Sequence, residues 1–342
     1  MIESIFDQIS EIRKELGFSR GVSPRIDFVY SHDDESLHII TPDRAEKSLL
    51  LGPGGRIITE LAKRVSKKVT VYGQDEILLK QHRLQLTLNR IDEIFSTVNI
   101  GQKQFLDLLR NLVTRELSFP EHTLIPVFSS NPKLKVAVAY SGGIDSSAAI
   151  FVLTQSALRP DAITVELGSE YYSPYETGKI RKWCDEIGVK QILIQPIRSV
   201  TKVIQDTEDG KIHPCGKCHA IIQDSMIKFA SENQYDILVT GELLPNGRQS
   251  ILFDDKILIV HLPAALALSK YRTEILAEQS GKKLGRRRFG CRLVTKANKK
   301  GWRNIGPSIF RVLRELEGGI LTTGQGLEYI KDIVRPWIDE RS

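Results

Sequence analysis

The sequence contains few cysteines and lacks a long apolar run. Four cysteines among 342 residues are too few for the disulfide framework of a small secreted domain. No stretch approaches the ~18 consecutive apolar residues of a membrane-spanning helix. The N-terminal residues MIESIFDQISEIRKEL mix charged and apolar side chains, whereas a signal peptide needs an uninterrupted apolar segment. We therefore expect a cytoplasmic protein with no membrane partner.

Two common phosphate-binding motifs are also missing. The chain has no GxxxxGK(S/T) loop of the common NTPases, and no GxGxxG turn opens a nucleotide-binding helix. The rest of the composition is that of a globular protein, with 41% hydrophobic and 26% charged residues. Domains have roughly 150 residues each, so the length of this chain predicts about two domains. The formal net charge is +6, which matters only where basic residues gather.

The first third of the chain predicts a small α+β domain. Apolar spacing indicates a helix over 4–16, two strands within 25–42, a helix over 56–64 after a glycine-rich turn, and a short strand over 68–73. Two amphipathic helices are expected next, at 76–98 and 102–116.

The remainder predicts an α/β domain with a mostly parallel sheet. Prolines and serines over 119–132 indicate a linker. After it, buried strands alternate with helices, and ligands of such sheets bind at the carboxyl ends of the strands. We expect the domains at 1–118 and 133–275, followed by a basic and mainly helical region at 276–342.

A loop that follows the first predicted strand of the α/β domain is the strongest chemical signal. The strand Val136–Tyr140 runs into SGGIDSS and then a helix. Two glycines allow backbone amides to approach an anion, and the helix N-terminus adds partial positive charge. Serine hydroxyls can donate hydrogen bonds to phosphate, and Asp145 can help to hold Mg²⁺. The predicted phosphate-binding residues are Ser141, Gly142, Gly143, Asp145, Ser146 and Ser147.

The SGGIDSS run resembles the signature of the PP-loop ATP pyrophosphatase superfamily. The resemblance implies an adenine nucleotide α-hydrolase-like domain that uses ATP and Mg²⁺ and adenylates a carbonyl oxygen, with Asp145 as a catalytic residue. The strand end ILVTGE resembles that of 4-thiouridine synthetases, which implies that Gly241 and Glu242 line the nucleotide cleft. Lys270 and Arg272, in a helix that these enzymes also have, are expected near the phosphate.

Three of the four cysteines suggest a metal or redox site. Cys215 and Cys218 form a CxxC pair, and Cys291 stands further along the chain. They can bind zinc together with His213 or His219, perform persulfide and disulfide chemistry, or hold an iron–sulfur cluster. Within the PP-loop superfamily the pattern resembles tRNA thiolation enzymes with a 4Fe–4S cluster, which implies that all three are ligands and that Cys215 and Cys291 are catalytic.

The fourth cysteine, Cys184, lies in a predicted helix without a partner nearby in sequence and is expected in the core.

Two segments suggest RNA binding. Residues 281–303 carry ten basic and no acidic residues, with Phe289 and Trp302 placed for base stacking. Near the N-terminus, the apolar residues 49–51, expected to be a strand, precede GPGG and a helix, and this order resembles a KH domain. The predicted RNA contacts are Gly52, Gly54, Gly55, Arg286, Arg287 and Arg288.

The combination predicts an ATP-dependent tRNA sulfurtransferase that replaces a uridine or cytidine carbonyl oxygen with sulfur. Its partners are tRNA, an unidentified sulfur donor and, as a possible arrangement, a second copy of the chain. Two alternatives stay open at this point. One is a PP-loop ligase that acts on a small molecule and holds structural zinc, and the other is a non-catalytic RNA-binding protein.

Overall fold

The computed structural model describes residues 2–18, 22–32, 36–119, 134–254, 256–285 and 289–339. The chain forms two compact units, one of residues 1–85 and 114–124 and one of residues 86–113 and 125–342. The predicted linker, apart from residue 119, and Arg286, Arg287 and Arg288 lie outside the described residues. None of the described helices is long and apolar enough to span a membrane.

The first unit is built on a three-stranded sheet in the order β1-β2-β3. Strands β1 and β2 pair antiparallel, whereas β2 and β3 pair parallel with Ile39 opposite Val71. The elements are α1 (Ile2–Glu15), β1 (Phe28–His32), β2 (Ser36–Thr41), α2 (Arg44–Leu51), η1 (Pro53–Gly55), α3 (Arg56–Val65) and β3 (Lys68–Gly73). The predicted first helix, the two strands after it, the helix after the glycine-rich turn and the last strand are all present, with the additional helix α2 between β2 and the turn.

Apolar residues at helical spacing attach the helices to this sheet. Ile5, Ile9 and Ile12 of α1 form one buried cluster with Ile57 and Leu61 of α3. The strand predicted over residues 49–51 is wrong, because these residues end the helix α2. Asp43 caps that helix by accepting a hydrogen bond from the Glu46 amide, so an N-cap signal starts a helix that was not predicted.

The GPGG segment is an exposed turn between two helices. Gly52, Gly54 and Gly55 all have positive φ angles, of 70°, 63° and 72°. A Cβ atom on Gly52 would lie 2.6 Å from the Ile57 side chain, whereas one on Gly54 or Gly55 would meet nothing within 4 Å. The turn therefore needs glycine for its backbone conformation, and its outer side is open to a ligand.

The second unit contains a six-stranded sheet in the order β6-β5-β4-β7-β9-β8. All neighbouring strands pair parallel except β8 and β9, which form an antiparallel hairpin at one edge. The strands are β4 (Val136–Ala139), β5 (Asp161–Val165), β6 (Gln191–Ile194), β7 (Ile237–Thr240), β8 (Ile251–Asp254) and β9 (Ile257–His261). The predicted α/β fold with a mostly parallel sheet is confirmed. The hairpin was not predicted, although every residue of β9 is buried.

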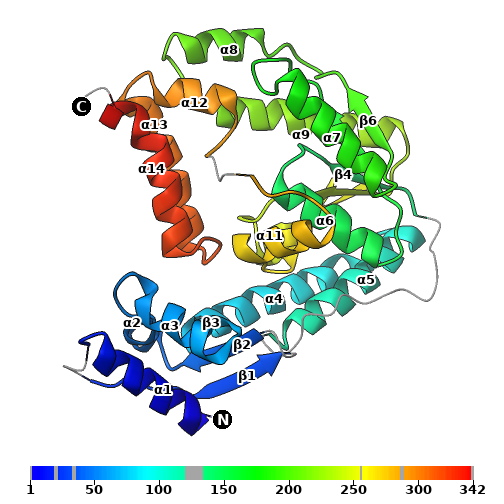
Figure 1. The fold of residues 1–342 in the computed structure, drawn as a ribbon. Helices are drawn as coiled ribbons and strands as arrows, with labels where there is room; N and C mark the ends of the chain where they lie inside the picture. The colour runs from blue at the N-terminus through cyan, green and yellow to red at the C-terminus, as the bar shows by residue number, and fades with distance from the viewer. Residues whose placement is uncertain are drawn as a thin grey trace. The chain divides into compact units, whose positions relative to one another are not determined.

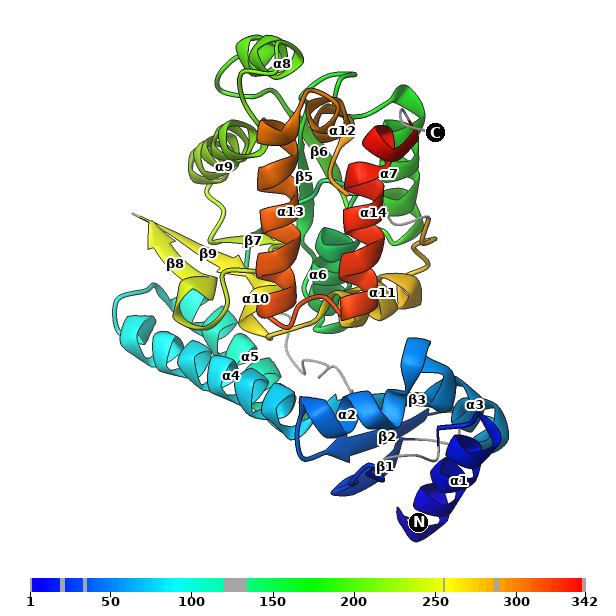
Figure 2. The same cartoon turned by 90° about the vertical axis from the view of Figure 1, so that its left-hand side faces the viewer.

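Helices cover both faces of this sheet. Figure 2 shows α6 and α7 on one face and α9 on the other. After β4 the chain adds β5 and β6 on one side of this strand and then adds β7 and β9 on its other side. This change of side creates a topological switch point between β4 and β7. The helices that connect or follow the strands are α6 (Ile144–Gln155), α7 (Pro174–Glu186), α8 (Thr201–Glu208), α9 (Cys215–Glu232), η2 (Gly247–Ser250), α10 (Leu262–Ala265) and α11 (Lys270–Gln279).

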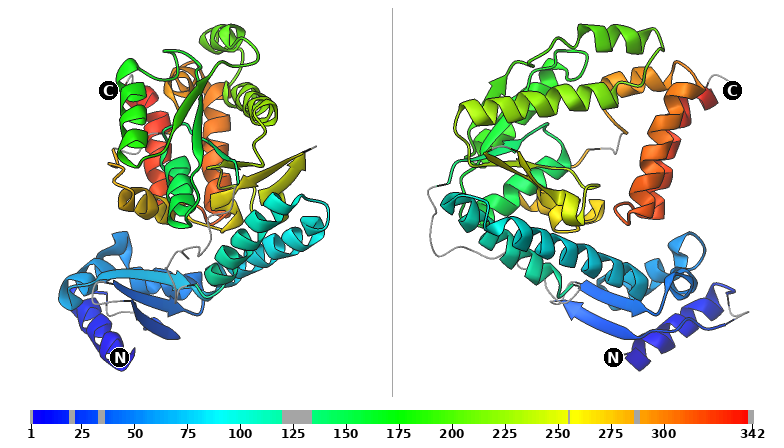
Figure 3. Two further views of the ribbon diagram at one scale, coloured as in Figure 1. Left: turned by 90° about the vertical axis from the view of Figure 1, so that its right-hand side faces the viewer. Right: turned by 180° about the vertical axis from the view of Figure 1, so that it is seen from behind.

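The basic C-terminal region is helical, as predicted. It comprises α12 (Arg292–Asn298), α13 (Trp302–Glu317) and α14 (Thr323–Asp339), and Figure 1 and Figure 3 show α13 and α14 running side by side. Phe289 is buried and packs edge-to-face against Tyr329 at a centroid distance of 5.9 Å. The prediction that Phe289 stacks on bases is therefore wrong, whereas Trp302 is 74% exposed.

Two long helices, α4 (Gln74–Phe95) and α5 (Ile100–Glu116), occupy the region predicted to contain two amphipathic helices. In the second unit, the buried side chain of Gln102 anchors the start of α5 to the sheet. Its Nε2 donates to the carbonyls of Asp236, at 3.1 Å, and Lys256, at 2.7 Å, next to the starts of β7 and β9. Its Oε1 accepts from the amide of Asn99, which closes the first turn of the helix.

We expect the substitution Gln102→Leu to lower the free energy of unfolding by about 1–3 kcal/mol, because buried polar groups lose their hydrogen-bond partners. Denaturant unfolding followed by circular dichroism measures the change. The control is Gln104→Leu, since Gln104 is exposed on the same helix. Equal stability of the two variants would contradict the anchoring role.

Candidate active site

A cavity of about 270 Å³ opens at the switch point between β4 and β7. Its volume is close to the lower end of the ~300–1,000 Å³ of small-molecule sites. One part of its wall is apolar and consists of Ala139, Ile222, Met226, Leu238 and Ile259. The other part is polar and consists of Ser141, Gly143, Asp145, Ser146, His219, Gln223, Thr240, Gly241, Glu242 and His261. An apolar surface for a flat ring beside a polar edge suits a nucleotide.

The predicted phosphate loop forms the turn from β4 into α6. Gly142 has a φ angle of 74°, and a Cβ atom there would lie 2.3 Å from the Ile180 side chain. The hydroxyls of Ser146 and Ser147 donate to the Gly143 carbonyl at 3.1 and 2.9 Å. Ser147 is fully buried, so its hydroxyl shapes the loop rather than lining the cavity. Ser141, Gly143 and Ser146 do line it.

The end of β7 approaches the first turn of α6 very closely. A Cβ atom on Gly241 would lie 2.5 Å from the Ser146 amide nitrogen and 2.8 Å from its Cα. Glycine is therefore required here by the backbone of the facing helix, without a positive φ angle. This contact joins the end of β7 to the start of α6, and Gly241 and Glu242 both line the cavity. Their role in a nucleotide cleft, which the resemblance implies, stays a prediction.

Asp145 is held by the helix α11. Its carboxylate oxygens accept hydrogen bonds from Lys270 Nζ at 2.8 and 2.7 Å, and Oδ1 accepts a third from Thr273 Oγ1 at 2.7 Å. The Asp145 side chain is 27% exposed, and its carboxylate raises the pKa of Lys270 against the effect of burial. Lys270 therefore contacts the loop through the Asp145 carboxylate, and its expected approach to a phosphate stays a prediction. The contribution of Thr273 was not predicted, because only the tertiary structure brings α11 against α6.

Two histidines contribute to the polar wall. The buried His261 shares a hydrogen bond of 2.7 Å between its Nδ1 and Thr240 Oγ1. Burial lowers the pKa of His261, and the neighbouring Glu242 opposes this shift. His219 Nε2 lies 3.3 Å from Glu242 Oε1. Neither Thr240 nor His261 was predicted as a site residue. Their contact could not be foreseen from the sequence because His261 belongs to the strand β9, which was not predicted.

The three predicted ligand cysteines lie in one region beside this cavity. Cys215 begins α9, Cys218 follows one turn later, and Cys291 caps α12. Tyr171 donates or accepts a hydrogen bond with Cys218 Sγ at 3.1 Å, and its pKa is raised by burial, by this bond and by all three thiols. All four cysteines are free thiols.

The thiols are in a low-polarity environment with one cation nearby. Burial raises the pKa of Cys215 to about 11, and the positive charge of the Arg311 guanidinium opposes the shift. Burial also raises the pKa of Cys218. Among the residues that the structure describes, no three His, Cys, Asp or Glu side chains are grouped as ligands of one metal ion. The thiols are thus neighbours without forming a closed ligand set.

Neither histidine considered for zinc binding joins the cysteines. His219 lines the nucleotide cavity with Glu242. His213 Nε2 shares a hydrogen bond of 3.0 Å with Ser308 Oγ of α13, and burial lowers its pKa. The possible metal ligands in this region are therefore the three cysteine sulfurs, without a histidine nitrogen.

Behind the phosphate loop, Lys282 packs against two aromatic rings. Its Nζ donates to the Tyr140 hydroxyl at 2.9 Å and lies 4.7 Å from the centre of the Trp183 ring. Burial lowers the pKa of Lys282 to about 8, with the Cys184 thiol nearby acting in the opposite direction. Cys184 is fully buried, as predicted. Because Tyr140 immediately precedes Ser141, this cluster supports the start of the loop.

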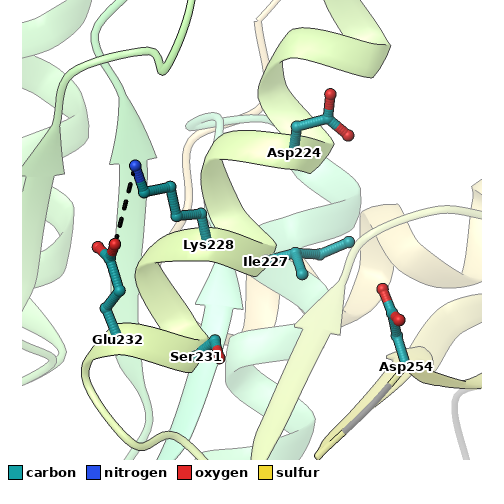
Figure 4. A pocket seen from close by; sticks show the side chains of 6 residues that line it. All are labelled: Asp224, Ile227, Lys228, Ser231, Glu232 and Asp254. Atoms are coloured by element: carbon teal, nitrogen blue, oxygen red, sulfur yellow. Dashed lines mark ion pairs between the residues drawn. The ribbon is translucent and has the colours of Figure 1, made fainter.

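A second depression, of about 450 Å³, lies on the outer side of α9. Figure 4 shows its lining side chains, which are Asp224, Ile227, Lys228, Ser231, Glu232 and Asp254. Lys228 lies 3.8 Å from Glu232, and Asp224 pairs with Arg198. Most of the charged side chains of this depression are thus paired.

Comparisons with known proteins point toward tRNA-modifying enzymes. No protein-family model matches the chain. It is 27% identical over 260 residues to an uncharacterized protein of Methanocaldococcus jannaschii, covering 75% of this chain and 94% of that protein. It is 26% identical over 118 residues to the tRNA-5-methyluridine(54) 2-sulfurtransferase of Pyrococcus horikoshii, covering 34% of this chain and 38% of the enzyme.

Two further proteins are similar. The tRNA-specific 2-thiouridylase of Fusobacterium nucleatum is 25% identical over 132 residues, covering 36% of this chain and 35% of that enzyme. The solved U34-tRNA thiolase of Methanococcus maripaludis, which contains a 4Fe–4S cluster, superposes with a TM-score of 0.39 and 16% identity over 69% of this chain and 79% of its own. The chain thus spans little more than a third of the sulfurtransferase and the thiouridylase.

We expect Gly241→Ala to abolish ATP binding, because its Cβ would lie 2.5 Å from the Ser146 amide nitrogen and force β7 away from α6. Isothermal titration with a non-hydrolysable ATP analogue and Mg²⁺ measures the loss. The control is Gly178→Ala in the helix α7, where a Cβ meets nothing within 4 Å. Unchanged affinity in folded Gly241→Ala would contradict the requirement.

The low pKa of Lys282 predicts a pH-dependent stability. Folding lowers this pKa from 10.5 to about 8, so between these values the unfolded chain binds more protons and the residue's contribution to stability rises with pH. Relative to wild type, Lys282→Met should gain most stability below pH 8, and the gain should shrink toward pH 10.5. Urea unfolding at a series of pH values measures it, with the exposed Lys283→Met as control. Parallel stability profiles of wild type and Lys282→Met would disprove the assignment.

Proposed function

We propose that this protein is an ATP-dependent tRNA sulfurtransferase with a PP-loop ATP pyrophosphatase domain. The observation that carries the proposal is the pairing of a phosphate loop with three neighbouring thiols through one helix, since α9 supplies both Cys215 and Cys218 at its start and Ile222 and Met226 to the cavity. Two of the sequence relatives are tRNA-thiolating enzymes by name.

The first half-reaction activates the base. A carbonyl oxygen of a tRNA pyrimidine attacks the α-phosphorus of ATP, and the bond to the leaving pyrophosphate breaks. Amides at the start of α6 and the hydroxyl of Ser141 face the phosphates, and Mg²⁺ neutralises the charge on the pyrophosphate. Asp145 holds Mg²⁺ or positions Lys270 toward the phosphates, and both roles require its carboxylate.

The second half-reaction delivers sulfur. A sulfur nucleophile attacks the activated carbon, and AMP departs with the former carbonyl oxygen. We propose that Cys215, Cys218 and Cys291 hold a 4Fe–4S cluster, since their donor set is sulfur alone. When bound by three protein thiolates, such a cluster offers an open iron for hydrosulfide. Tyr171 forms a hydrogen bond with Cys218, and the positive charge of Arg311 acts on the Cys215 thiol.

The N-terminal unit is proposed to bind RNA through a KH-like GPGG turn. Gly54 and Gly55 present backbone without side chains, and open space surrounds their Cα atoms. A sugar–phosphate backbone can approach such a turn closely, and Arg56 begins the helix that follows it. Both named relatives are 2-thiolating enzymes, which favours position 2 of the pyrimidine over position 4.

The deciding experiment is mass spectrometry of tRNA nucleosides from cells that lack this protein. One thionucleoside should disappear and return with wild type but not with Asp145→Asn or Cys291→Ser. Cys184→Ala, which removes a buried thiol elsewhere, should restore it. Iron and acid-labile sulfide in the anaerobically purified protein test the cluster separately.

Three results would contradict parts of the proposal. An unchanged thionucleoside profile would favour a ligase for a small molecule. Zinc without iron would replace the cluster by a structural site. Tight tRNA binding without pyrophosphate release from ATP would favour a non-catalytic RNA-binding protein.

A further inference from the structure

We propose that the outward face of α13, formed by Trp302, Gly306, Phe310 and Leu313, is a stacking surface for unpaired nucleotides of the tRNA. The inference rests on the proposed function in naming tRNA as the source of those nucleotides. The binding chemistry itself follows from the side chains of this helix, which sequence analysis identified only at Trp302.

The exposure of these side chains is unusual for large apolar residues. Trp302 is 74% exposed, Phe310 62% and Leu313 49%. With 3.6 residues per turn, the positions 302, 306, 310 and 313 fall within an arc of roughly 80° on the helix. Ile305 and Val312, which lie about 60–80° beyond Trp302 around the helix, are buried, so the exposed side chains form a second apolar face of α13.

Cations flank this face. Arg303 and Arg314 lie at its edge, and the Arg314 guanidinium is 5.9 Å from the centre of the Phe310 ring. Lys299 and Lys300 lead into the helix. In the part of the chain that the structure describes, no ion pair engages the side chains of Lys299, Lys300 or Arg303. Single-stranded nucleic acid binds where aromatic rings lie beside unpaired cations, since its bases stack on the rings and its phosphates pair with positive charge.

Gly306 leaves a gap in the middle of the face. A Cβ atom there would meet nothing within 4 Å. Trp302 and Phe310 lie one turn before and one turn after this glycine, about 12 Å apart along the axis. The gap allows a base to reach the helix backbone between the two rings.

The thiols lie against the buried side of this helix. Cys215 and Cys291 pack against the buried cluster that contains Ile305 and Val312. Figure 2 shows α13 next to α14 on the side of the unit that faces the viewer there. A nucleotide stacked on the outward face therefore contacts the protein outside the thiol region and holds the tRNA rather than the reacting base.

Charge argues for RNA rather than for a second copy of the chain on this face. In a twofold-symmetric dimer the same patch meets itself, so Arg303 and Arg314 of both copies would be brought together. Between residues 292 and 317 the chain carries seven Lys or Arg residues against two Glu. Of the seven, Lys296 pairs with Glu170 and Glu208, and Arg311 pairs with Glu315. An anionic partner satisfies this surface.

The experiment titrates the full-length protein with purified bulk tRNA and with an oligouridine, using Trp302 fluorescence and filter binding at two salt concentrations. Stacking contributes roughly fivefold to more than hundredfold in affinity per base, so Trp302→Ala with Phe310→Ala should weaken binding by at least tenfold. Trp302→Phe should retain most of the affinity. Gly306→Gln should weaken binding by filling the gap. Ile100→Ala, at a 78% exposed apolar position on α5, should have no effect.

Two outcomes would overturn the proposal. One is unchanged affinity for both RNAs in the folded double variant. The other is concentration-dependent dimerisation of wild type, seen by sedimentation, that the double variant loses. If the double variant loses RNA binding but thionucleosides never depend on the protein, the stacking surface stands and the proposed sulfurtransferase function fails.

Discussion

The close packing of Gly241 against Ser146 is the constraint on which the candidate site depends. It brings the end of β7 into contact with the first turn of α6, so the phosphate loop and the Thr240–Glu242 strand end share one cavity. The sheet topology makes this contact possible, because the phosphate loop follows β4 and the Thr240–Glu242 segment lies at the end of β7, on either side of the switch point. Without a glycine at this position the strand end would have to move outward, and the apolar wall would separate from the polar one.

Asp145 shows how tertiary structure refines a motif. The loop places a carboxylate beside the expected phosphates, where its charge alone would repel them. Lys270 and Thr273 of α11 satisfy that carboxylate and bring a cation with it. The loop and α11 therefore act together, although more than a hundred residues separate them. The position of Lys270 beside the loop is thus fixed by the protein itself.

Local sequence patterns predicted much of the fold and part of the site. The alternation of strands and helices predicted the parallel sheet, and SGGIDSS predicted a loop that lines the cavity. The strand β9 was missed because ILIVH is a short apolar run that periodicity cannot distinguish from buried helix. The helix α2 was not predicted, because its three consecutive leucines were interpreted as a strand in spite of the N-cap residue Asp43. His261, Thr273 and Arg311 follow from packing alone, since no spacing in the sequence relates them to the residues that they contact.

The helix α9 makes the two halves of the site mechanically inseparable. Its 18 residues form a rod of about 27 Å, with two thiols in its first turn and cavity-lining side chains one to three turns later. Because one helix carries both sets of side chains, the helix itself sets the distance along its axis between the thiols and the cavity. That distance follows from backbone geometry and does not depend on how two separate elements pack together.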